Sequence, residues 1–284
     1  MKKNLLAATA IALALSAGSA LAADLPSHKG PPPAYIPPPP LMTWTGFYVG
    51  VNAGYTFSNS NAISLNTFDA TGGVNGIGPG AQAIGEIPFG TSLNNDGFIG
   101  GGQIGYNWQF NNSFVVGIET DIQGAATGSK SSSYLLQAAG HVPALTTFTR
   151  GGPDYLGTVR GRLGFLVTPT LLVYGTGGLA YGQTSVSFSM FGPQWGPPLA
   201  IGASYSDTRV GWTAGGGVEW MFAPNWSAKA EYLYYDLGRA STPTAFYAFG
   251  PGAAYATTRF DGHVVRAGLN YHFNWGSVPV VAKY

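Results

Sequence analysis

Apolar and polar residues alternate along most of this chain with a period of two. In residues 114–124, FVVGIETDIQG, Phe114, Val116 and Ile118 share one face, and Glu119 and Asp121 share the other. Successive side chains of a β-strand point to opposite faces, so this pattern predicts a strand with one apolar and one polar face. No stretch between residues 44 and 273 shows a helical period.

Eight segments show this alternation. They span residues 44–57, 97–110, 114–126, 154–167, 171–187, 206–222, 226–238 and 257–273. The connections between them alternate between short turns containing Asn or Pro, which favour tight turns, and long loops. The short turns lie at 111–113, 168–170 and 223–225, and the long loops at roughly 58–96, 127–153, 188–205 and 239–256.

Short turns on one side and long loops on the other are typical of outer-membrane barrels. The sequence therefore predicts an all-β fold, an eight-stranded antiparallel transmembrane β-barrel with short periplasmic turns and long extracellular loops. An even number of strands places both termini on the periplasmic side. Because loops are by default mobile surface segments, we expect the first long loop to be flexible.

Charged residues indicate which faces line the barrel interior. Arg160 and Arg162 share one face of residues 154–167, and the opposite face is apolar. An arginine on the lipid face near the membrane midplane costs about 2–4 kcal/mol, so both should point inward. Buried charges need partners, and acids and bases occur on the inward faces of neighbouring strands. The predicted interior charge network comprises Glu119, Asp121, Arg160, Arg162, Glu219, Lys229, Glu231 and Arg266.

Adjacent strands place Glu219 beside Lys229 and Glu231 beside Arg266 in this prediction. A soluble barrel of the lipocalin type has the reverse pattern, with an apolar interior and a polar exterior. The inward charges and apolar outward rows argue against that alternative.

Aromatic residues gather beside the predicted strand ends, as the girdles of a membrane barrel do. The periplasmic set comprises Trp44, Phe47, Trp108, Phe110, Phe114, Phe165, Trp220, Phe222, Trp226, Tyr271 and Phe273. The outer set comprises Tyr55, Phe57, Phe98, Tyr155, Tyr181 and Tyr234.

The N-terminal segment has the features of a secretory signal peptide. A basic start, MKK, precedes an apolar run and a small-residue site, so we expect cleavage between Ala22 and Ala23. We predict a signal peptide at 1–22, a proline-rich periplasmic spacer at 23–43, the barrel at 44–273 and a C-terminal tail at 274–284. Proline lacks the N–H that a sheet requires, so the spacer should not join the barrel.

Composition argues against several other classes of protein. Charged residues make up 9% of the chain, and the formal net charge is +1. Nucleic-acid binding normally requires a concentrated basic patch, so we expect no nucleic-acid partner. The chain has no Cys, and its four His are scattered. We therefore predict no metal site, no cofactor and no enzymatic activity, although some outer-membrane barrels are lipid-modifying enzymes that use Ser and His.

Several segments resemble the small outer-membrane β-barrel family, OmpA-like and OmpX-like in its membrane domain. The similarity is greatest to the α-proteobacterial porin-family major outer-membrane immunogens. It is carried by WTGFYVGVNAGY (44–55), VRGRLGF (159–165), YGTGGLAYG (174–182), GWTAGGGVEW (211–220), KAEYLYYDLG (229–238) and VRAGLNYHF (265–273). The resemblance implies the outer membrane of a Gram-negative bacterium, with lipid and lipopolysaccharide as the surroundings.

Two further expectations come from this resemblance. Arg266, Gly268, Tyr271 and Phe273 are similar to the β-signal that the barrel-assembly machinery reads, although eleven residues follow Phe273. Either this internal signal is read or the terminal aromatic residue contributes. In some members an Ala-Asp N-terminus is joined to peptidoglycan, and Ala23-Asp24 matches it, which would make the spacer a tether.

The expected function is structural. The barrel would support envelope integrity and display its loops, with an interior plugged by ion pairs. One alternative is a narrow porin-like channel for small solutes. Another, which the resemblance permits, is loop-mediated binding of a host molecule or a small ligand such as haem.

Overall fold

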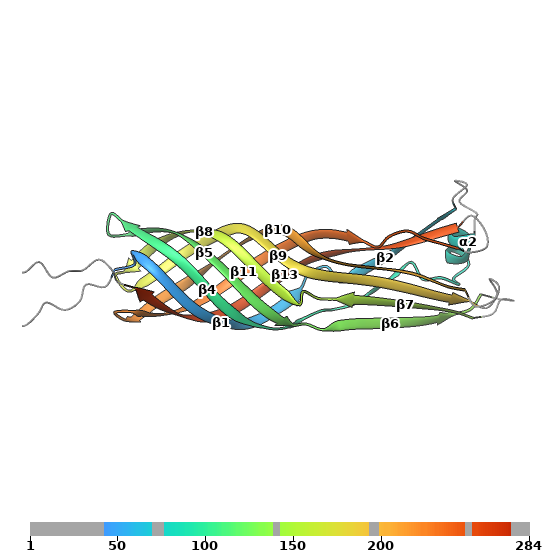
Figure 1. Ribbon diagram of the computed structural model, residues 1–284, viewed down its shortest axis with the longest axis horizontal. Helices are drawn as coiled ribbons and strands as arrows, with labels where there is room; N and C mark the ends of the chain where they lie inside the picture. The colour runs from blue at the N-terminus through green and yellow to red at the C-terminus, as the bar shows by residue number, and fades with distance from the viewer. Residues whose placement is uncertain (1–42, 70–76, 139–142, 193–198, 248–251, 274–284) are drawn as a thin grey trace, which may run out of the picture. The chain divides into compact units, whose positions relative to one another are not determined.

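A computed structural model describes residues 43–69, 77–138, 143–192, 199–247 and 252–273. Its main feature is a ring of eight antiparallel strands (Figure 1). The ring strands are β1 (Gly46–Ser58), β4 (Gly97–Phe110), β5 (Phe114–Ala126), β8 (Tyr155–Thr168), β9 (Leu171–Gly192), β10 (Leu199–Ala223), β11 (Trp226–Ser241) and β13 (Gly252–Phe273). Each strand pairs with the next, and β13 pairs with β1 to close the ring. The predicted eight-stranded antiparallel barrel is confirmed.

One end of the barrel, which we call the turn end, carries the short turns that the sequence predicts between strands. Asn111 and Asn112 have positive φ angles of 50° and 57° in the turn between β4 and β5, a conformation that asparagine tolerates better than most residues. Phe47 of the first strand lies opposite Phe273 of the last. The barrel therefore begins and ends at the end that carries the tight turns.

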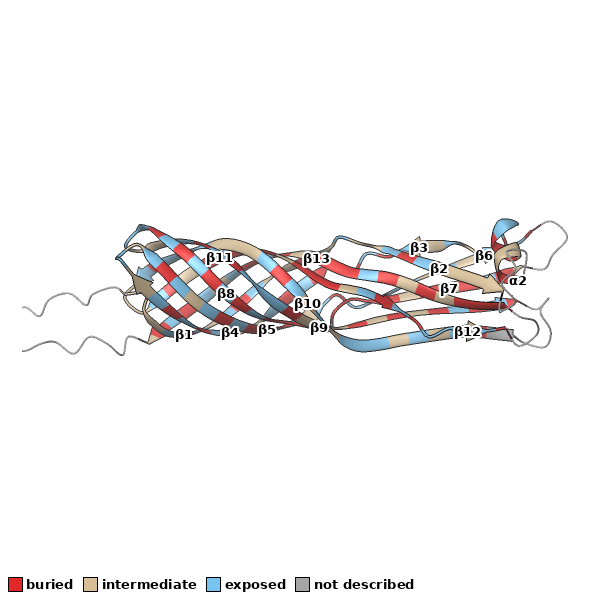
Figure 2. Ribbon diagram, turned by 90° about the horizontal axis from the view of Figure 1, so that it is seen from above, coloured by how far each residue is buried: buried red, intermediate tan, exposed pale blue. Residues whose placement is uncertain are grey.

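The polarity of the two faces reverses along the longest strands. On β9 the outward side chains change from Val173 and Leu179 to Ser187, while the inward ones change from Thr176 to Phe188. Outward positions are apolar where lipid surrounds a barrel and polar where water does. The part beside the tight turns (left in Figure 2) therefore has the pattern of a membrane barrel. The part beyond it, the upper part (right in Figure 2), has the pattern of a water-exposed sheet with an apolar core.

This upper part, which we call the extension, includes six elements outside the ring. They are β2 (Ala62–Asp69), α2 (Ile77–Ala83), β3 (Gly90–Ser92), β6 (Ser129–Leu136), β7 (Ala144–Gly151) and β12 (Ala245–Phe246). The strand order β6–β7–β9–β10 makes one sheet, and β11–β13–β2–β3 makes a second. Their shared apolar core includes Ile63, Leu65, Phe148, Val186, Phe188, Met190, Ile201 and Phe260.

The expectation that the first long loop is flexible was wrong for its described part. Residues 62–69 form β2, which pairs with β13, and β3 pairs with β2. Gln82 of α2 donates a hydrogen bond to the Leu65 carbonyl at 3.1 Å. The segment is ordered by the core it shares with the opposite sheet. None of the helices in the described part of the chain is sufficiently long and apolar to span a bilayer.

One aromatic residue does not belong to the predicted periplasmic girdle. Trp44 is 1% exposed, and its indole Nε1 donates a hydrogen bond to the Pro169 carbonyl at 3.0 Å. It packs inside the turn end of the barrel with Leu166, Leu172 and Met221. The period of two extended back from β1 puts Trp44 on the inward face with Tyr48, which is fully buried. Only its nearness to a strand end suggested the girdle. Its position closes the turn end of the interior with apolar side chains.

Candidate functional site

The candidate site is the charge network inside the barrel. The alternation of β8 turns Arg160 and Arg162 inward, and β5 lies beside it with Glu119 directly opposite Arg160. The Arg160 guanidinium contacts three carboxylates, Glu119 at 2.5 Å, Asp121 at 2.9 Å and Glu231 at 2.8 Å. Two of these acids come from β5, and Glu231 comes from β11. Arg160 therefore connects opposite walls of the barrel.

Arg162 makes a second set of contacts toward the turn end. Its Nη2 lies 2.5 Å from Glu219, and its Nη1 lies 3.4 Å from Glu119. It also donates a hydrogen bond to the Tyr48 hydroxyl at 2.7 Å, and its guanidinium stacks over the Tyr174 ring at 4.0 Å. Flat guanidinium groups favour such combined carboxylate and aromatic contacts.

Lys229 does not make the ion pair expected from its position in the ladder. It lies directly opposite Glu219 on the adjacent strand, but its ammonium group contacts both oxygens of Glu119, at 2.8 and 2.9 Å. Glu219 forms its ion pair with Arg162 rather than with Lys229, through its Oε2 oxygen. The barrel is narrow enough for a long side chain to reach a better placed acid on another strand.

Arg266 makes the expected pair with Glu231 at 2.5 Å and a further pair with Asp121 at 2.9 Å. The structure thus brings all eight predicted residues into one contact network, and each is at most 4% exposed. Four acids and four bases balance in charge, so the network needs no counterion. Removing one member leaves the buried network with one uncompensated charge, which is strongly destabilising.

Sequence reasoning missed the polar residues that complete the network. The Tyr48 hydroxyl donates to Glu119 at 2.7 Å, and the Tyr174 hydroxyl donates to Glu231 at 3.1 Å. Thr158 donates to Asp121 and accepts from Arg160, both at 2.8 Å. These residues lie on inward faces, so the same period of two could have found them. They were missed because they carry no charge.

A chain of amides continues the network along the interior. Asn52 donates to Gln103 at 2.9 Å, Gln103 donates to Asn270 at 2.5 Å, and Asn270 donates to Glu219 at 2.7 Å. Ser227 also donates to Glu219, at 2.6 Å, and its oxygen lies 2.8 Å from His272 Nε2. Closer to the tight turns is the apolar cluster around Trp44. In the described part of the barrel, charged and amide side chains therefore share the middle of the interior, and apolar side chains occupy its turn end.

Arg150, in the extension, is a second buried cation that the sequence did not single out. It is 2% exposed and donates to the carbonyls of Leu93 at 3.0 Å and Arg259 at 2.9 Å. Its guanidinium also stacks over the Phe260 ring at 4.9 Å. Burial lowers the pKa of Arg150, but a guanidinium stays charged in proteins. Arg150 thereby ties β7 to β13 across the two sheets.

The residues of the predicted assembly signal take separate positions on β13. Arg266 points into the charge network, while Tyr271 is partly exposed on the outer surface. The ring of Tyr271 lies 5.1 Å from that of Phe273 and 5.2 Å from that of Trp226. Gly268 lies opposite Asn52 in the ladder. Recognition by an assembly machinery stays a prediction.

Other predicted features lie outside the described residues. These are Ala22, Ala23 and Asp24, the rest of the signal peptide, nearly all of the proline-rich spacer and the C-terminal tail. Within the described ranges, no group of three or more His, Asp or Glu residues is arranged to hold a metal ion.

A closed ring with an apolar outer band and a filled polar interior has the architecture of a small membrane barrel. The family model described as outer membrane protein beta-barrel domain matches residues 10–273. This chain belongs to that family. As a member of the outer-membrane β-barrel family, the protein is located in the outer membrane, surrounded by lipid and lipopolysaccharide.

Relatives of this family member carry similar names. A 31 kDa outer-membrane immunogenic protein of Brucella melitensis is 37% identical over 275 residues, which cover 96% of this chain and 100% of that protein. A 22 kDa outer membrane protein of Rhizobium leguminosarum bv. viciae is 30% identical over 202 residues, 70% of this chain and 67% of that protein. The predicted resemblance to small outer-membrane barrels and outer-membrane immunogens is confirmed.

Solved structures of small barrels share little sequence with this family member. The outer membrane protein OprG of Pseudomonas aeruginosa is 11% identical with a TM-score of 0.40, over 82% of this chain and 98% of that chain. Neisserial surface protein A is 14% identical with a TM-score of 0.34, over 81% and 98% of the two chains. The fold described above therefore rests on the strand ladders of this chain.

Proposed function

We propose that this outer-membrane barrel is a structural protein that supports envelope integrity and displays its extension at the cell surface. The observation that carries the proposal is the filled interior. Side chains from opposite walls meet at 2.5–2.9 Å around Arg160, and Arg160, Glu119, Asp121 and Glu231 have side chains that are fully buried. An eight-stranded barrel leaves just enough interior space for its own side chains, so this interior is a plug.

The proposed orientation places the tight turns and both termini in the periplasm. Long loops of outer-membrane barrels face outward and short turns face inward. The extension would then lie outside the cell, which is compatible with the name of a relative, an outer-membrane immunogenic protein. Attachment of Ala23-Asp24 to peptidoglycan and recognition of the last strand by the barrel-assembly machinery remain parts of the proposal that need their own tests. The proposal includes no catalytic role.

The plugged interior predicts electrical silence. Refolded protein in a planar bilayer should show no discrete conductance steps at either of two salt concentrations, because ions cannot pass the paired charges. Heat-modifiable migration on gels serves as the control that the same sample is folded. Discrete steps that scale with salt would contradict the plug and favour a narrow channel.

The orientation predicts which positions are accessible from outside the cell. Because the chain has no Cys, single replacements give clean labelling sites. Ser133→Cys, exposed on β6, should react with a membrane-impermeant maleimide on intact cells, whereas Thr168→Cys, exposed at a tight turn, should react only after the outer membrane is opened. The reverse result would mean that the extension faces the periplasm.

A further inference from the structure

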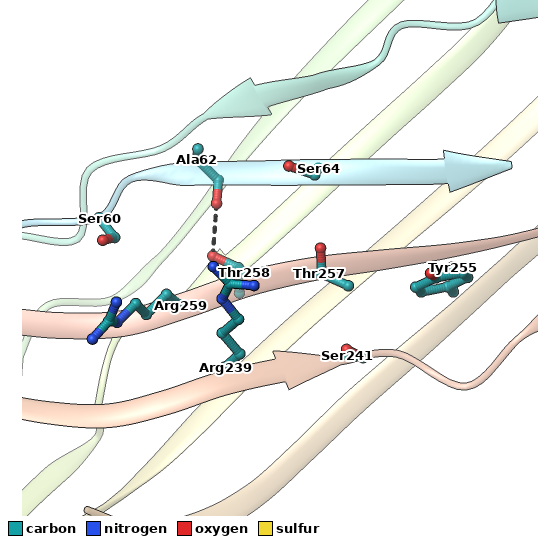
Figure 3. A pocket seen from close by; sticks show the side chains of 9 residues that line it. All are labelled: Ser60, Ala62, Ser64, Arg239, Ser241, Tyr255, Thr257, Thr258 and Arg259. Atoms are coloured by element: carbon teal, nitrogen blue, oxygen red, sulfur yellow. Dashed lines mark hydrogen bonds between the residues drawn. The ribbon is translucent and has the colours of Figure 1, made fainter.

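A polar groove opens on the outward side of the extension, where β2, β11 and β13 lie side by side. Its volume is about 530 Å³. Figure 3 shows the side chains that line it, with hydroxyl groups and two guanidinium groups together. The lining residues are Ser60, Ala62, Ser64, Arg239, Ser241, Tyr255, Thr257, Thr258 and Arg259.

The two arginines of this groove form an unusual pair. Arg239 and Arg259 lie directly opposite each other in the β11–β13 ladder, and both are exposed. Like charges directly opposite each other destabilise a sheet. Asp236 binds Arg259, but no carboxylate of the described residues lies within 4 Å of Arg239. An anion placed between the two guanidinium groups would relieve this repulsion.

Asp261, two residues from Arg259 on β13, is engaged with other groups. Asp261 accepts hydrogen bonds from Asn59 at 2.8 Å, from the Ser60 backbone N–H at 3.1 Å and from the Tyr234 hydroxyl at 3.0 Å. These bonds occupy both of its oxygens and direct them toward the β1–β2 connection. The free positive charge of the groove is therefore that of Arg239, with Arg259 able to share a bound anion.

The groove lies just beyond the apolar band of the barrel. On β13 the outward side chains are apolar from Val265 to the turn end, and His263 lies at the upper border opposite Phe57 and Tyr234. Arg259 is four residues farther along, roughly 13 Å at 3.3 Å per residue. We infer from this position that lipid headgroups would meet the protein near the groove.

A second groove lies below the polar one on the lipid-facing surface. It has a volume of about 640 Å³ and is lined by Ala53, Gly54, Tyr55, Phe57, Phe98, Ile99 and Val265. Ala53 lies opposite Ala267 on one side and Gly100 on the other, so the wall is thin there. Phe57 of this groove and Ser60 of the polar groove are three residues apart in the chain. Both grooves border β13, at Val265 and at 255–259.

We propose that these two grooves form one binding site for a phosphorylated glycolipid of the outer leaflet. The phosphate binds between Arg239 and Arg259, since guanidinium groups bind phosphate oxygens in bidentate fashion. The hydroxyls of Ser64, Ser241 and Thr257 face the sugar. An acyl chain occupies the apolar groove below. The assignment to the outer leaflet rests on the proposed orientation of the extension, whereas the chemistry of the site does not.

Binding of diphosphoryl lipid A to the folded full-length protein in detergent micelles tests this site by native mass spectrometry. The double variant Arg239→Ala/Arg259→Ala, and Arg239→Ala alone, should weaken binding by about tenfold or more, as expected for lost charge-assisted hydrogen bonds. Lys130→Ala, an exposed cation that lines neither groove, is the matched control and should bind as the unchanged protein does. Heat-modifiable migration verifies folding of each variant.

Two further arms identify the ligand. Ala53→Trp, which fills the apolar groove without changing charge, should also weaken lipid A binding. Dephosphorylated lipid A, phosphatidylglycerol and inorganic phosphate should each bind more weakly than diphosphoryl lipid A. Equal binding by the double arginine variant, or an equal loss in Lys130→Ala, would overturn the site. Phosphatidylglycerol or inorganic phosphate binding as tightly as lipid A would overturn the glycolipid assignment.

This experiment separates the site from the proposed orientation. Binding in micelles does not depend on which side of the membrane the extension faces. If the cysteine labelling were reversed while lipid A binding still depended on Arg239, the site would stand and the outer-leaflet assignment would fail.

Discussion

Replacing Arg160 with alanine is expected to lower the free energy of unfolding by about 3–5 kcal/mol, the usual cost of breaking a buried ion pair by removing one partner. Arg160 contacts Glu119, Asp121 and Glu231, all with fully buried side chains. Without it, four acids face three bases in a space that water cannot readily enter. Urea unfolding of the barrel in lipid vesicles, followed by tryptophan fluorescence, measures the change.

Val159→Ala is the matched control for this prediction. Val159 is the preceding residue of the same strand, and it is 41% exposed on the lipid-facing side. Its truncation removes no interior contact, so the unfolding midpoint should change little. If Arg160→Ala unfolded at the same urea concentration as Val159→Ala, the interior network would not be a source of stability.

An additional arginine placed one residue along the same strand, on the lipid side, should have the second largest effect. Leu163 neighbours Arg162 but points to the lipid side, where it is 63% exposed. Leu163→Arg places a guanidinium in the hydrocarbon region near the midplane and should cost about 2–4 kcal/mol. The variant should fold into vesicles in lower yield and unfold at lower urea concentration.

The same substitution at Val167 tests whether depth determines this cost. Val167 lies on the same face of β8, beside the tight turn, and is 57% exposed. An arginine near the interface should cost about 0–1 kcal/mol. Equal destabilisation by Leu163→Arg and Val167→Arg would mean that the apolar band does not mark the membrane.

The period of two predicted the barrel because lipid and a polar interior impose opposite requirements on alternate residues. The same rule places Arg160 and Arg162 inside from the sequence alone. It could not name the partner of Lys229, because that contact with Glu119 crosses the interior rather than following the ladder. For Trp44 the rule gives the correct inward face, shared with Tyr48, and the error came from assigning aromatics near strand ends to the girdle.

The extension was hidden for a different reason. Its strands β2 and β7 are eight residues each, and their apolar faces contain few residues, such as Ile63 and Phe148. Each face becomes a core only when the opposite sheet covers it. Local sequence shows the alternation but not the second sheet, so the region resembles an ordinary polar loop.

The reversal of polarity along β9 also determines which parts of this surface can change over evolutionary time. Above the membrane, Ser185, Ser187 and Ser189 point away from the core, while Val186 and Phe188 hold the two sheets together. Substitutions at the three serines would alter the exterior without disturbing the packing beneath. In the proposed orientation, an antibody directed at this face would meet a surface that can change while the packing beneath it stays the same.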